Sequence, residues 1–365
     1  MFTGTICSIL LFVNSKKKKS NKYLGLAILG FVWLNTKILL HSLNLWEIHG
    51  FGFFPNGIEL AIPPLFYFYL VSLVQPMFKF ERNQWLHFSP FFLSQVYAIL
   101  VYIAIMQTQV YSEKRIIAHS FLFNEVKHIE EYLTIISTLI YLYFGYQHIQ
   151  KYRNWLSKNI ADTKYSELNF LNILLFGISF ISVYIFTNLM LNPVLTYEYN
   201  WRWTLGHVFI AVLVYYLGLV GYKNSDLVPP EFSIKPKPKQ LKNLTDEVQS
   251  DILSKLKIAI DEDKVHLNPK LSLQELASLI SVNDTHLSNS INTYYGENFR
   301  AFINKKRVEE VKKCLANDNF NNLTFIGLAK ECGFNSEASF YRIFKKVVGI
   351  TPKQYLEKNR KLPKN

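Results

Sequence analysis

Long apolar runs alternate with short polar stretches through the first 222 residues of the chain. A membrane-spanning helix needs about 20 mostly apolar residues. Six runs reach or approach that length, and a seventh, at residues 1–13, is shorter. The six runs are 23–43, 57–74, 86–106, 132–149, 168–191 and 203–222. The pattern therefore predicts an N-terminal bundle of six or seven transmembrane helices.

Positive charge in the connections between these runs indicates their orientation. Lys and Arg total eleven in the connections 14–22, 75–85 and 150–167. They total four in the alternate connections 44–56, 107–131 and 192–202. The positive-inside rule places the richer set in the cytoplasm, and the region after residue 222 with it. We therefore expect a multi-pass protein of a bacterial inner membrane, anchored in the lipid bilayer, with a cytoplasmic C-terminus.

Composition changes at the end of the last apolar run. Residues 1–222 contain 26 charged side chains, whereas the shorter region 223–365 contains 41, which favours two different solvents for the two parts. The alternative is a soluble, all-helical protein with buried helices, but such helices have no reason to obey a charge alternation in their loops. Cys7, Cys314 and Cys332 lack metal-ligand spacing, so neither a metal site nor a cofactor is expected.

Several polar residues fall in the outer halves of the predicted spans. A charge inside a bilayer is costly, so such residues usually face the interior of a helix bundle. One interpretation is a sensor pocket open to the outside, which would bind a small-molecule or protein signal. The other is that these side chains reach the membrane surface or form hydrogen bonds between helices. The residues concerned are Lys37, His41, Glu59, Asn188 and His207.

The region after the apolar runs is divided by a linker at 223–243, in which four prolines exclude a continuous helix. The domain at 244–361 begins with a helical period and contains the capping-box sequence that starts at Ser272 and ends at Glu275. A helix that starts there is followed by a turn at 281–284 and a second helix to about Tyr295. This order of elements predicts a helix-turn-helix.

The helix-turn-helix pattern then repeats. Leu276-Ala277 recurs as Leu328-Ala329, and Gly296 recurs as Gly349. A long amphipathic stretch at 298–317 joins the two copies. We therefore expect an all-α chain, a polytopic helical bundle followed by a double helix-turn-helix domain.

The sequence FIGLAKECGFNSEASFYRIFKKVVGITPKQY at 325–355 resembles the signature of AraC-type transcription regulators. The stretch NFRAFINKKRVEEVKKCL at 298–315 resembles the connecting helix of that family, and the likeness covers about 244–358. The resemblance implies sequence-specific binding to double-stranded DNA through two helix-turn-helix units on a rigid connector. The effector-binding barrel common in that family has no counterpart here, since the apolar runs occupy its place.

Helices in the major groove read base edges with exposed polar residues near their N-termini. Basic residues elsewhere contact phosphates and set register rather than sequence. The candidate base contacts are Thr285, His286, Ser288, Asn289 and Asn292 on the first helix, and Ser336, Ser339, Tyr341, Arg342 and Lys345 on the second. The candidate phosphate contacts are Lys305, Lys306, Arg307, Lys346 and Lys353.

Together these patterns predict a membrane-embedded transcription regulator that is not an enzyme. The alternative is a membrane transporter or enzyme with an appended regulatory module, although no zinc-protease, P-loop or dinucleotide-binding motif is present. A third interpretation makes the apolar part a passive tether. Pairing into a homodimer fits a tethered regulator, but no heptad run indicates it.

Overall fold

The computed structural model describes residues 1–15, 18–36, 39–40, 43, 45, 48–55, 57–75, 78–161, 169–191, 201–223, 246–316 and 324–360. Within these ranges the chain is helical, and the β-structure is one isolated bridge between Ile160 and Ser272. The chain divides into two compact units. The N-terminal unit comprises Met1–Gln150 and Asn169–Ser233, and the C-terminal unit comprises Lys151–Leu168 and Ile234–Asn365. The segment that starts at Lys151 was not part of the predicted C-terminal domain.

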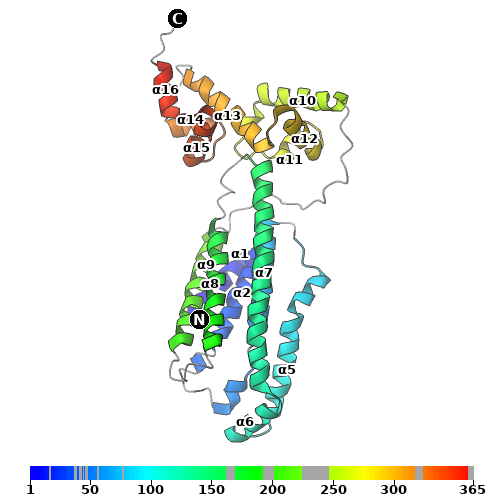
Figure 1. Ribbon diagram of the computed structural model, residues 1–365, viewed down its shortest axis with the longest axis vertical. Coiled ribbons are helices and arrows are strands. Elements are labelled where there is room, and N and C mark those ends of the chain that lie inside the picture. Colours follow the sequence, from blue (N-terminus) through cyan, green and yellow to red (C-terminus); the bar gives the residue numbers. More distant parts are fainter. Residues whose placement is uncertain are drawn as a thin grey trace. The chain divides into compact units, whose positions relative to one another are not determined.

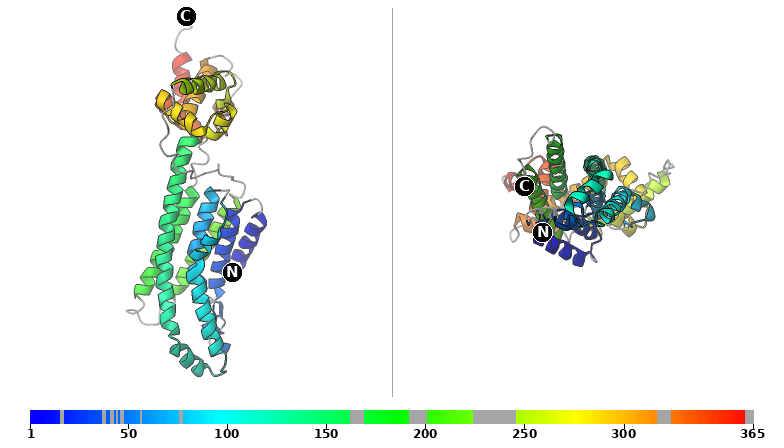
Figure 2. Two further views of the ribbon diagram at one scale, coloured as in Figure 1. Left: turned by 90° about the vertical axis from the view of Figure 1, so that its right-hand side faces the viewer. Right: turned by 90° about the horizontal axis from the view of Figure 1, so that it is seen from below.

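The N-terminal unit consists of α-helices and short 3-10 helices. Helices α1, α2 and α9 pack against one another, α4 packs against α2, and α8 lies beside α9 (Figures 1 and 2). The elements are α1 (Phe2–Asn14), α2 (Ser20–Leu34), η1 (Ile48–Phe53), η2 (Glu59–Ala61), α4 (Ile62–Val74), η3 (Arg82–Phe88), α5 (Ser89–Ile105), α6 (Tyr111–Ser120), α7 (Phe123–Asn159), α8 (Asn169–Leu191) and α9 (Trp201–Lys223).

Small residues allow the close approach of α1 to its neighbours. A Cβ added to Gly218 of α9 would lie 2.5 Å from the Sγ of Cys7, so no side chain fits at this helix crossing. On the other flank of α1, the buried Ser8 hydroxyl donates to the carbonyl of Gly25 in α2 at 2.8 Å. Close packing of small residues and hydrogen bonds between helices are typical of helix association in membranes.

Three stretches of the described residues are long and apolar enough to cross a membrane, namely Arg82–Ile105, Phe170–Leu191 and Leu205–Tyr222. They overlap the predicted spans 86–106, 168–191 and 203–222. Phe2–Asn14 and Glu59–Val74 are apolar but shorter, and α2 ends at Leu34, inside the predicted span 23–43. The predicted run 132–149 lies within α7, whose ends are polar. A bundle of six or seven spans stays a prediction.

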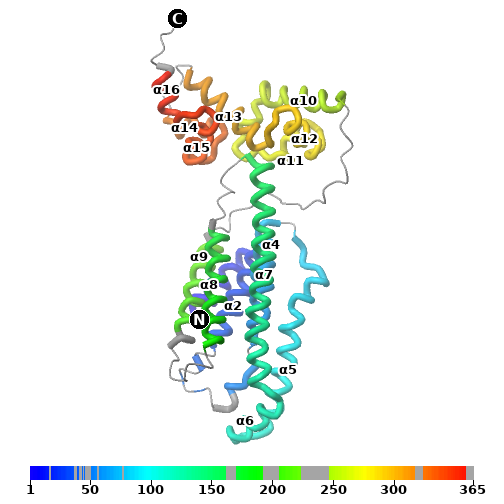
Figure 3. The backbone as a smooth tube through the Cα atoms, in the orientation of Figure 1, coloured from blue at the N-terminus to red at the C-terminus, as the bar shows by residue number. Residues whose placement is uncertain are grey.

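The C-terminal unit contains the two predicted helix-turn-helix motifs. The first consists of α11 and α12, the second of α14 and α15, and α13 runs from one to the other (Figure 3). The elements are α10 (Asp246–Asp261), η5 (Val265–Leu267), α11 (Leu273–Leu279), α12 (Asp284–Tyr295), α13 (Phe299–Ala316), α14 (Phe325–Glu331), α15 (Glu337–Val348) and α16 (Pro352–Arg360).

Local sequence signals determine where these helices begin and end. The Ser272 hydroxyl accepts a hydrogen bond from the backbone N–H of Glu275 at 3.1 Å, as expected of the predicted N-cap of α11. Thr324 caps α14 in the same way, through the N–H of Gly327 at 3.1 Å. The repeated glycines Gly296 and Gly349 end α12 and α15 in left-handed conformations, with φ of 69° and 88°. The predicted repeat is thus confirmed in the backbone.

Each helix-turn-helix has its own apolar core. The first is centred on Leu276, Leu287 and Ile291, and the second on Leu328, Phe340 and Phe344, all of them buried. Helix α13 contributes to both, with Phe302 and Ile303 in the first core and Val308 and Val311 in the second. Because one uninterrupted helix supplies side chains to both cores, the two motifs form one unit.

Arg307 of α13 lies where the two motifs meet and is only 1% exposed. Its Nε donates to the carbonyl of His266 at 2.7 Å, and its Nη2 donates to the carbonyl of Asn268 at 2.8 Å. The guanidinium also lies over the ring of Phe334, at 6.0 Å from its centroid. A buried charge is tolerated only where it is hydrogen-bonded, and here two backbone carbonyls and an aromatic face surround it.

The turn of the second motif is held against the same loop. Gly333 has a φ of 83°, and a Cβ there would lie 2.8 Å from the carbonyl oxygen of Leu267 and 2.9 Å from the Nε of Arg307. Asn335 donates its amide to the carbonyl of Pro269 at 3.1 Å. The loop 264–269, Arg307 and this turn therefore form a continuous junction between the motifs.

His266 is the titratable group of that junction. Its side chain is buried, and neither ring nitrogen has a hydrogen-bond partner in the described part of the chain. Burial lowers the pKa of His266 below its ordinary value, and the nearby Glu310 only partly opposes this. The folded chain therefore takes up a proton at His266 less readily than the unfolded chain does.

Substituting Gly333→Ala should destabilise a C-terminal fragment, in which residues 151–161 are joined to residues 246–365 by a flexible linker, by roughly 3 kcal/mol or more. The loss comes from left-handed strain together with the overlap with Leu267 and Arg307. Gly349→Ala is the matched control, because its φ is 88° but nothing lies within 4 Å of an added Cβ, so about 1–2 kcal/mol is expected. Urea unfolding measures both free energies. Equal losses would contradict the close contact at the junction.

The same fragment should lose stability as the pH falls below about 6.5, the ordinary pKa at which His266 of the unfolded chain takes up a proton. The folded form binds that proton only at lower pH, so acid favours the unfolded chain until the folded-state pKa is passed. His266→Phe should reduce this loss in unfolding free energy between pH 7 and 5. An unchanged loss in the His266 variant would refute the prediction.

Candidate functional site

The second helices of the two motifs, α12 and α15, present the predicted base-contact residues. Asn283 caps α12 by accepting from the N–H of Thr285 at 2.9 Å, and Ser336 caps α15 by accepting from the N–H of Ser339 at 3.3 Å. Each cap fixes the start of its helix, which is the end that base readout uses. The two helices therefore begin in equivalent ways.

On α12 the predicted residues differ in how accessible they are. Asn292 is exposed, while His286, Ser288 and Asn289 are partly exposed. The Thr285 hydroxyl donates to the Asp284 carboxylate at 3.2 Å, so its hydrogen is already used within the helix. An asparagine amide can pair with both polar atoms of an adenine edge, which makes Asn292 and Asn289 the strongest candidates on this helix.

On α15 the exposed candidates are Arg342 and Lys345. Tyr341 is partly buried, packs against the second core and contacts the ring of Phe340 at 5.3 Å between centroids. Arg342 is a guanidinium in a position to make a bidentate contact with guanine. Arg342 is therefore the side chain of α15 best suited to direct base readout.

Ser339 does not fit its predicted role as a base contact. It is 5% exposed and lies at the third position of α15, directly beneath the capping Ser336 and beside the buried Phe340. Its backbone N–H is the donor of the helix cap. The residue therefore stabilises the start of α15 from the buried side of the helix. The prediction that Ser339 contacts a base is wrong.

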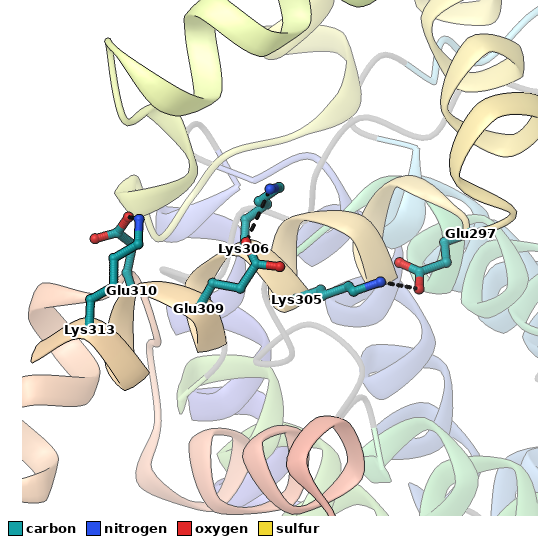
Figure 4. A network of polar contacts seen from close by, with 6 residues as sticks. All are labelled: Glu297, Lys305, Lys306, Glu309, Glu310 and Lys313. Atoms are coloured by element: carbon teal, nitrogen blue, oxygen red, sulfur yellow. Dashed lines mark hydrogen bonds and ion pairs between the residues drawn. The ribbon is translucent and has the colours of Figure 1, made fainter. Parts of the chain in front are cut away.

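The predicted phosphate contacts on α13 are engaged in ion pairs (Figure 4). Lys305 lies 3.3 Å from Glu297, and Lys306 lies 3.1 Å from Glu309. Exposed pairs of this kind contribute little free energy and are easily exchanged for a phosphate. Lys346 and Lys353 are exposed as well. These four lysines stay candidates for contacts with the DNA backbone.

Further along α13, the Lys313 ammonium donates to Glu310 at 2.7 Å (Figure 4). The Glu310 carboxylate also lies 3.8 Å from the ammonium of Lys264. Burial alone would raise the pKa of Glu310, but the hydrogen bond and charge of Lys313, together with Lys264, hold it below the ordinary value. Glu310 is thus a carboxylate that lies among lysines.

Arg307 requires a correction of the same kind as Ser339. It was predicted to contact phosphate because it follows Lys305 and Lys306 in a basic run, yet its guanidinium is buried and hydrogen-bonded to the carbonyls of His266 and Asn268. Every third or fourth residue of an amphipathic helix faces the core, and here a charged residue occupies such a position. Arg307 is a structural residue of the junction.

The N-terminal unit contains a cavity of about 360 Å³ between η2, α7, α8 and α9. Three residues of the predicted sensor pocket, Glu59, Asn188 and His207, line it. The other two, Lys37 and His41, lie outside the described residues. The structure therefore brings together three polar residues that are up to 148 positions apart in the sequence.

Sequence reasoning missed a further set of residues in the wall of this cavity. Glu130, Thr134 and Thr138 recur every four residues and so occupy one face of α7. The hydroxyl of Thr134 donates to the carbonyl of Glu130, and that of Thr138 donates to the carbonyl of Thr134. A polar stripe that starts just before the apolar run 132–149 and continues along one face of it was the available signal.

No group of three or more His, Cys, Asp or Glu side chains lies close enough to hold a metal ion within the ranges that the structure describes. Burial, with the neighbouring Cys314, raises the pKa of Cys332 to about 12, so this thiol stays protonated.

The comparisons with known proteins concern the C-terminal region. Residues 276–358 match a family model described as a helix-turn-helix domain. An uncharacterized HTH-type transcriptional regulator of Staphylococcus aureus is 36% identical over 95 residues, which are 26% of this chain and 12% of that protein. The regulatory protein PocR of Salmonella typhimurium is 26% identical over 123 residues, which are 33% of this chain and 40% of PocR.

One solved structure, described as a protein of unknown function from Listeria innocua, is 26% identical and covers 29% of this chain and 95% of its own, with a TM-score of 0.26. The chain spans only 12% of the length of the Staphylococcus aureus regulators that it matches. The family model and the paired motifs agree over the C-terminal region. Residues 276–358 are an AraC-type helix-turn-helix domain of the kind found in regulators that control transcription by binding DNA.

Proposed function

We propose that this protein is a membrane-embedded transcription regulator, with a multi-pass domain in a bacterial inner membrane and a cytoplasmic domain that binds specific promoter sequences. A signal received by the membrane domain would control the affinity of the cytoplasmic domain for DNA. The observation that carries the proposal is the pair of capped recognition helices, α12 and α15, on the single connecting helix α13.

The mode of DNA reading follows from that arrangement. Two recognition helices on one connector would enter major-groove segments about 34 Å apart, which is one turn of the duplex. Arg342 and Asn292, both exposed, would read base edges. Lys305, Lys306, Lys346 and Lys353 would contact phosphates and set the salt dependence. A regulator of this type needs no second subunit to contact two groove segments, although a homodimer remains compatible with the proposal.

The location in the membrane is supported by composition. Three stretches of the N-terminal unit have the length and apolar character of membrane spans. Large apolar side chains are exposed along them, such as Leu93 at 72% and Phe176 at 71%, which suits a lipid environment better than water. Combined with the alternation of positive charge in the connections, this supports a cytoplasmic C-terminus.

Control by a signal is supported by the cavity and by the course of α7. Thr134 and Thr138 of α7 line the cavity, whereas the end of the same helix, from Lys151, belongs to the C-terminal unit. Just beyond α7, Ile160 pairs with Ser272, the N-cap of α11, and Ala161 lies in the core of the first motif. A change at the cavity could therefore reach the DNA-binding unit through this helix.

Substituting Arg342→Ala should cost about 1–3 kcal/mol of binding to the preferred sequence and little of binding to random DNA, because a base contact specifies sequence. Lys353→Ala should weaken binding to all sequences alike and reduce the salt slope by about one, because a phosphate contact releases one counterion. Fluorescence-anisotropy titrations of the C-terminal fragment, against a sequence selected from a random library, measure both effects.

Lys255→Ala is the control for these titrations, since this exposed lysine of α10 pairs with Asp251 and is not a predicted DNA contact. The proposal is contradicted if the unsubstituted fragment selects no sequence over random DNA. It is equally contradicted if Arg342→Ala and Lys353→Ala have the same effect on discrimination.

The orientation is tested with reporter fusions at residues 107–110 and after residue 360. A periplasm-active phosphatase should be active at the first position and inactive at the second, since the positive-inside rule places these sites on opposite sides. A fluorescent protein that matures only in the cytoplasm should give the reverse pattern. Phosphatase activity at the C-terminal fusion would exclude DNA binding by this chain in the cell.

A further inference from the structure

The cavity in the N-terminal unit adjoins a second, apolar compartment. This smaller space has a volume of about 130 Å³, and three hydroxyl residues, Thr134, Thr138 and Ser182, line both it and the cavity of about 360 Å³. Because the two spaces share these walls, one ligand could occupy both. Their combined size is in the range of sites for small organic molecules.

The smaller compartment suits an apolar group. Helices α2, α4, α8 and α9 line it with aliphatic and aromatic side chains, among them Phe31, Phe66 and Leu213. The hydroxyl of Tyr141, also in this wall, lies 2.7 Å from Nδ1 of His87 and is thereby already engaged. An apolar cavity of roughly this volume holds a single benzene ring. The part of a ligand that enters here is therefore one ring or a short hydrocarbon chain.

The three shared hydroxyls use their hydrogens within their own helices. In α7, Thr134 donates to the carbonyl of Glu130 at 2.8 Å, and Thr138 donates to the carbonyl of Thr134 at 2.7 Å. In α8, Ser182 donates to the carbonyl of Ile178 at 2.8 Å. A hydroxyl has one hydrogen and a carbonyl can only accept, so each of these hydroxyls is left with its lone pairs. Where the two compartments meet, these three side chains therefore offer acceptors rather than donors.

Two charged side chains of the lining already have partners in the protein. Glu59 lines both compartments and already interacts with another group. Lys127 lines the larger compartment and lies 2.6 Å from Glu130. Whatever the charge on these groups, the three hydroxyl oxygens keep unused lone pairs at the junction of the compartments.

We propose that this cavity binds an apolar alcohol or phenol, with its ring or short chain in the smaller compartment and its O–H group donating to the hydroxyl oxygens of Thr134, Thr138 or Ser182. The inference names the chemical class of the signal and so rests on the proposed sensing function. An ether of the same shape has no hydrogen to donate, so it would contact the apolar wall but leave these acceptors unpaired.

The test uses two probes that share a phenyl body and differ in one hydrogen-bond donor: phenethyl alcohol and its methyl ether. Each is titrated against the full chain in lipid nanodiscs by ligand-observed NMR, and empty nanodiscs correct for partition into lipid. We expect the alcohol to bind roughly threefold to tenfold more tightly than the ether, the gain of about one net hydrogen bond. Equal binding of the two probes, tighter binding of the ether, or no binding of the alcohol would overturn the inference.

A triple variant, Thr134→Val with Thr138→Val and Ser182→Ala, removes the three acceptor oxygens with little change of shape. It should bind the alcohol and the ether within about twofold of each other, because the donor of the alcohol no longer has a partner. The affinity for the ether should stay within about twofold of that of the unsubstituted chain, and the ether thereby reports that the cavity is still formed. An alcohol preference that persists in this variant would refute the assignment, and the two probes with the unsubstituted chain test it without any variant.

Ser179→Ala with Thr187→Val is the matched control. These two hydroxyls of α8 also donate to carbonyls of their own helix, at 2.8 Å each, but lie outside the linings of both compartments. The control variant should keep the preference for the alcohol. Loss of the preference there would contradict the assignment to the shared hydroxyls.

A second readout separates this inference from the sensing function. The affinity of the full chain for its selected DNA is measured with and without each probe at saturation. An alcohol preference that depends on the shared hydroxyls but leaves DNA affinity unchanged would support the ligand class and contradict sensing. A DNA affinity that responds to the ether in place of the alcohol would support sensing and overturn the ligand class.

Discussion

The guanidinium of Arg307 holds the two helix-turn-helix motifs in one arrangement. It donates from the middle of the connecting helix to two carbonyls of the loop 264–269, and the turn of the second motif closes over that loop at Gly333 and Asn335. Removing one partner of a buried, charged hydrogen bond lowers the free energy of unfolding by far more than the bond itself contributes. The reason is that the remaining partner stays buried without water or a hydrogen bond. An interaction within the protein therefore sets the relative position of α12 and α15. Contacts with DNA are not needed to establish it.

This constraint explains how so few exposed side chains could read DNA. A rigid connector presents both recognition helices in a fixed register. Binding therefore does not cost the conformational entropy of ordering two flexibly joined modules. The ion pairs along α13 are of a different kind, since they are exposed and weak. The same helix thus carries a buried cation that maintains the fold and surface cations that remain available to an anionic partner.

Local signals made the C-terminal fold predictable from the sequence. Capping residues such as Ser272 and the glycines that end α12 and α15 act within one turn of their own helix, so their roles can be recognised without tertiary structure. Arg307 was assigned wrongly because its burial depends on segments far away in the sequence. For Arg307 the partners lie about 40 residues upstream, and a basic run gives no indication of which member turns inward.

The candidate pocket was only partly predictable for a related reason. Single polar residues such as Glu59, Asn188 and His207 stand out against apolar runs, but the face of α7 that joins them is fixed only when the helices pack. The segment from Lys151 to Ala161 was also overlooked as part of the DNA-binding unit. This segment continues the helical pattern of the earlier part of α7. The pattern does not reveal that the segment packs with the C-terminal unit, whereas the earlier part belongs to the N-terminal unit.

That segment makes the DNA-binding unit discontinuous along the chain. Ala161 enters the core of the first motif from a position more than 80 residues ahead of α10, and Ile160 meets the cap of α11. During synthesis this piece emerges from the ribosome well before the core that it joins, so assembly of the unit has to await the later helices. A chimera made by a single cut in the linker would leave part of the core behind, so grafting this unit onto another receptor requires transferring both pieces.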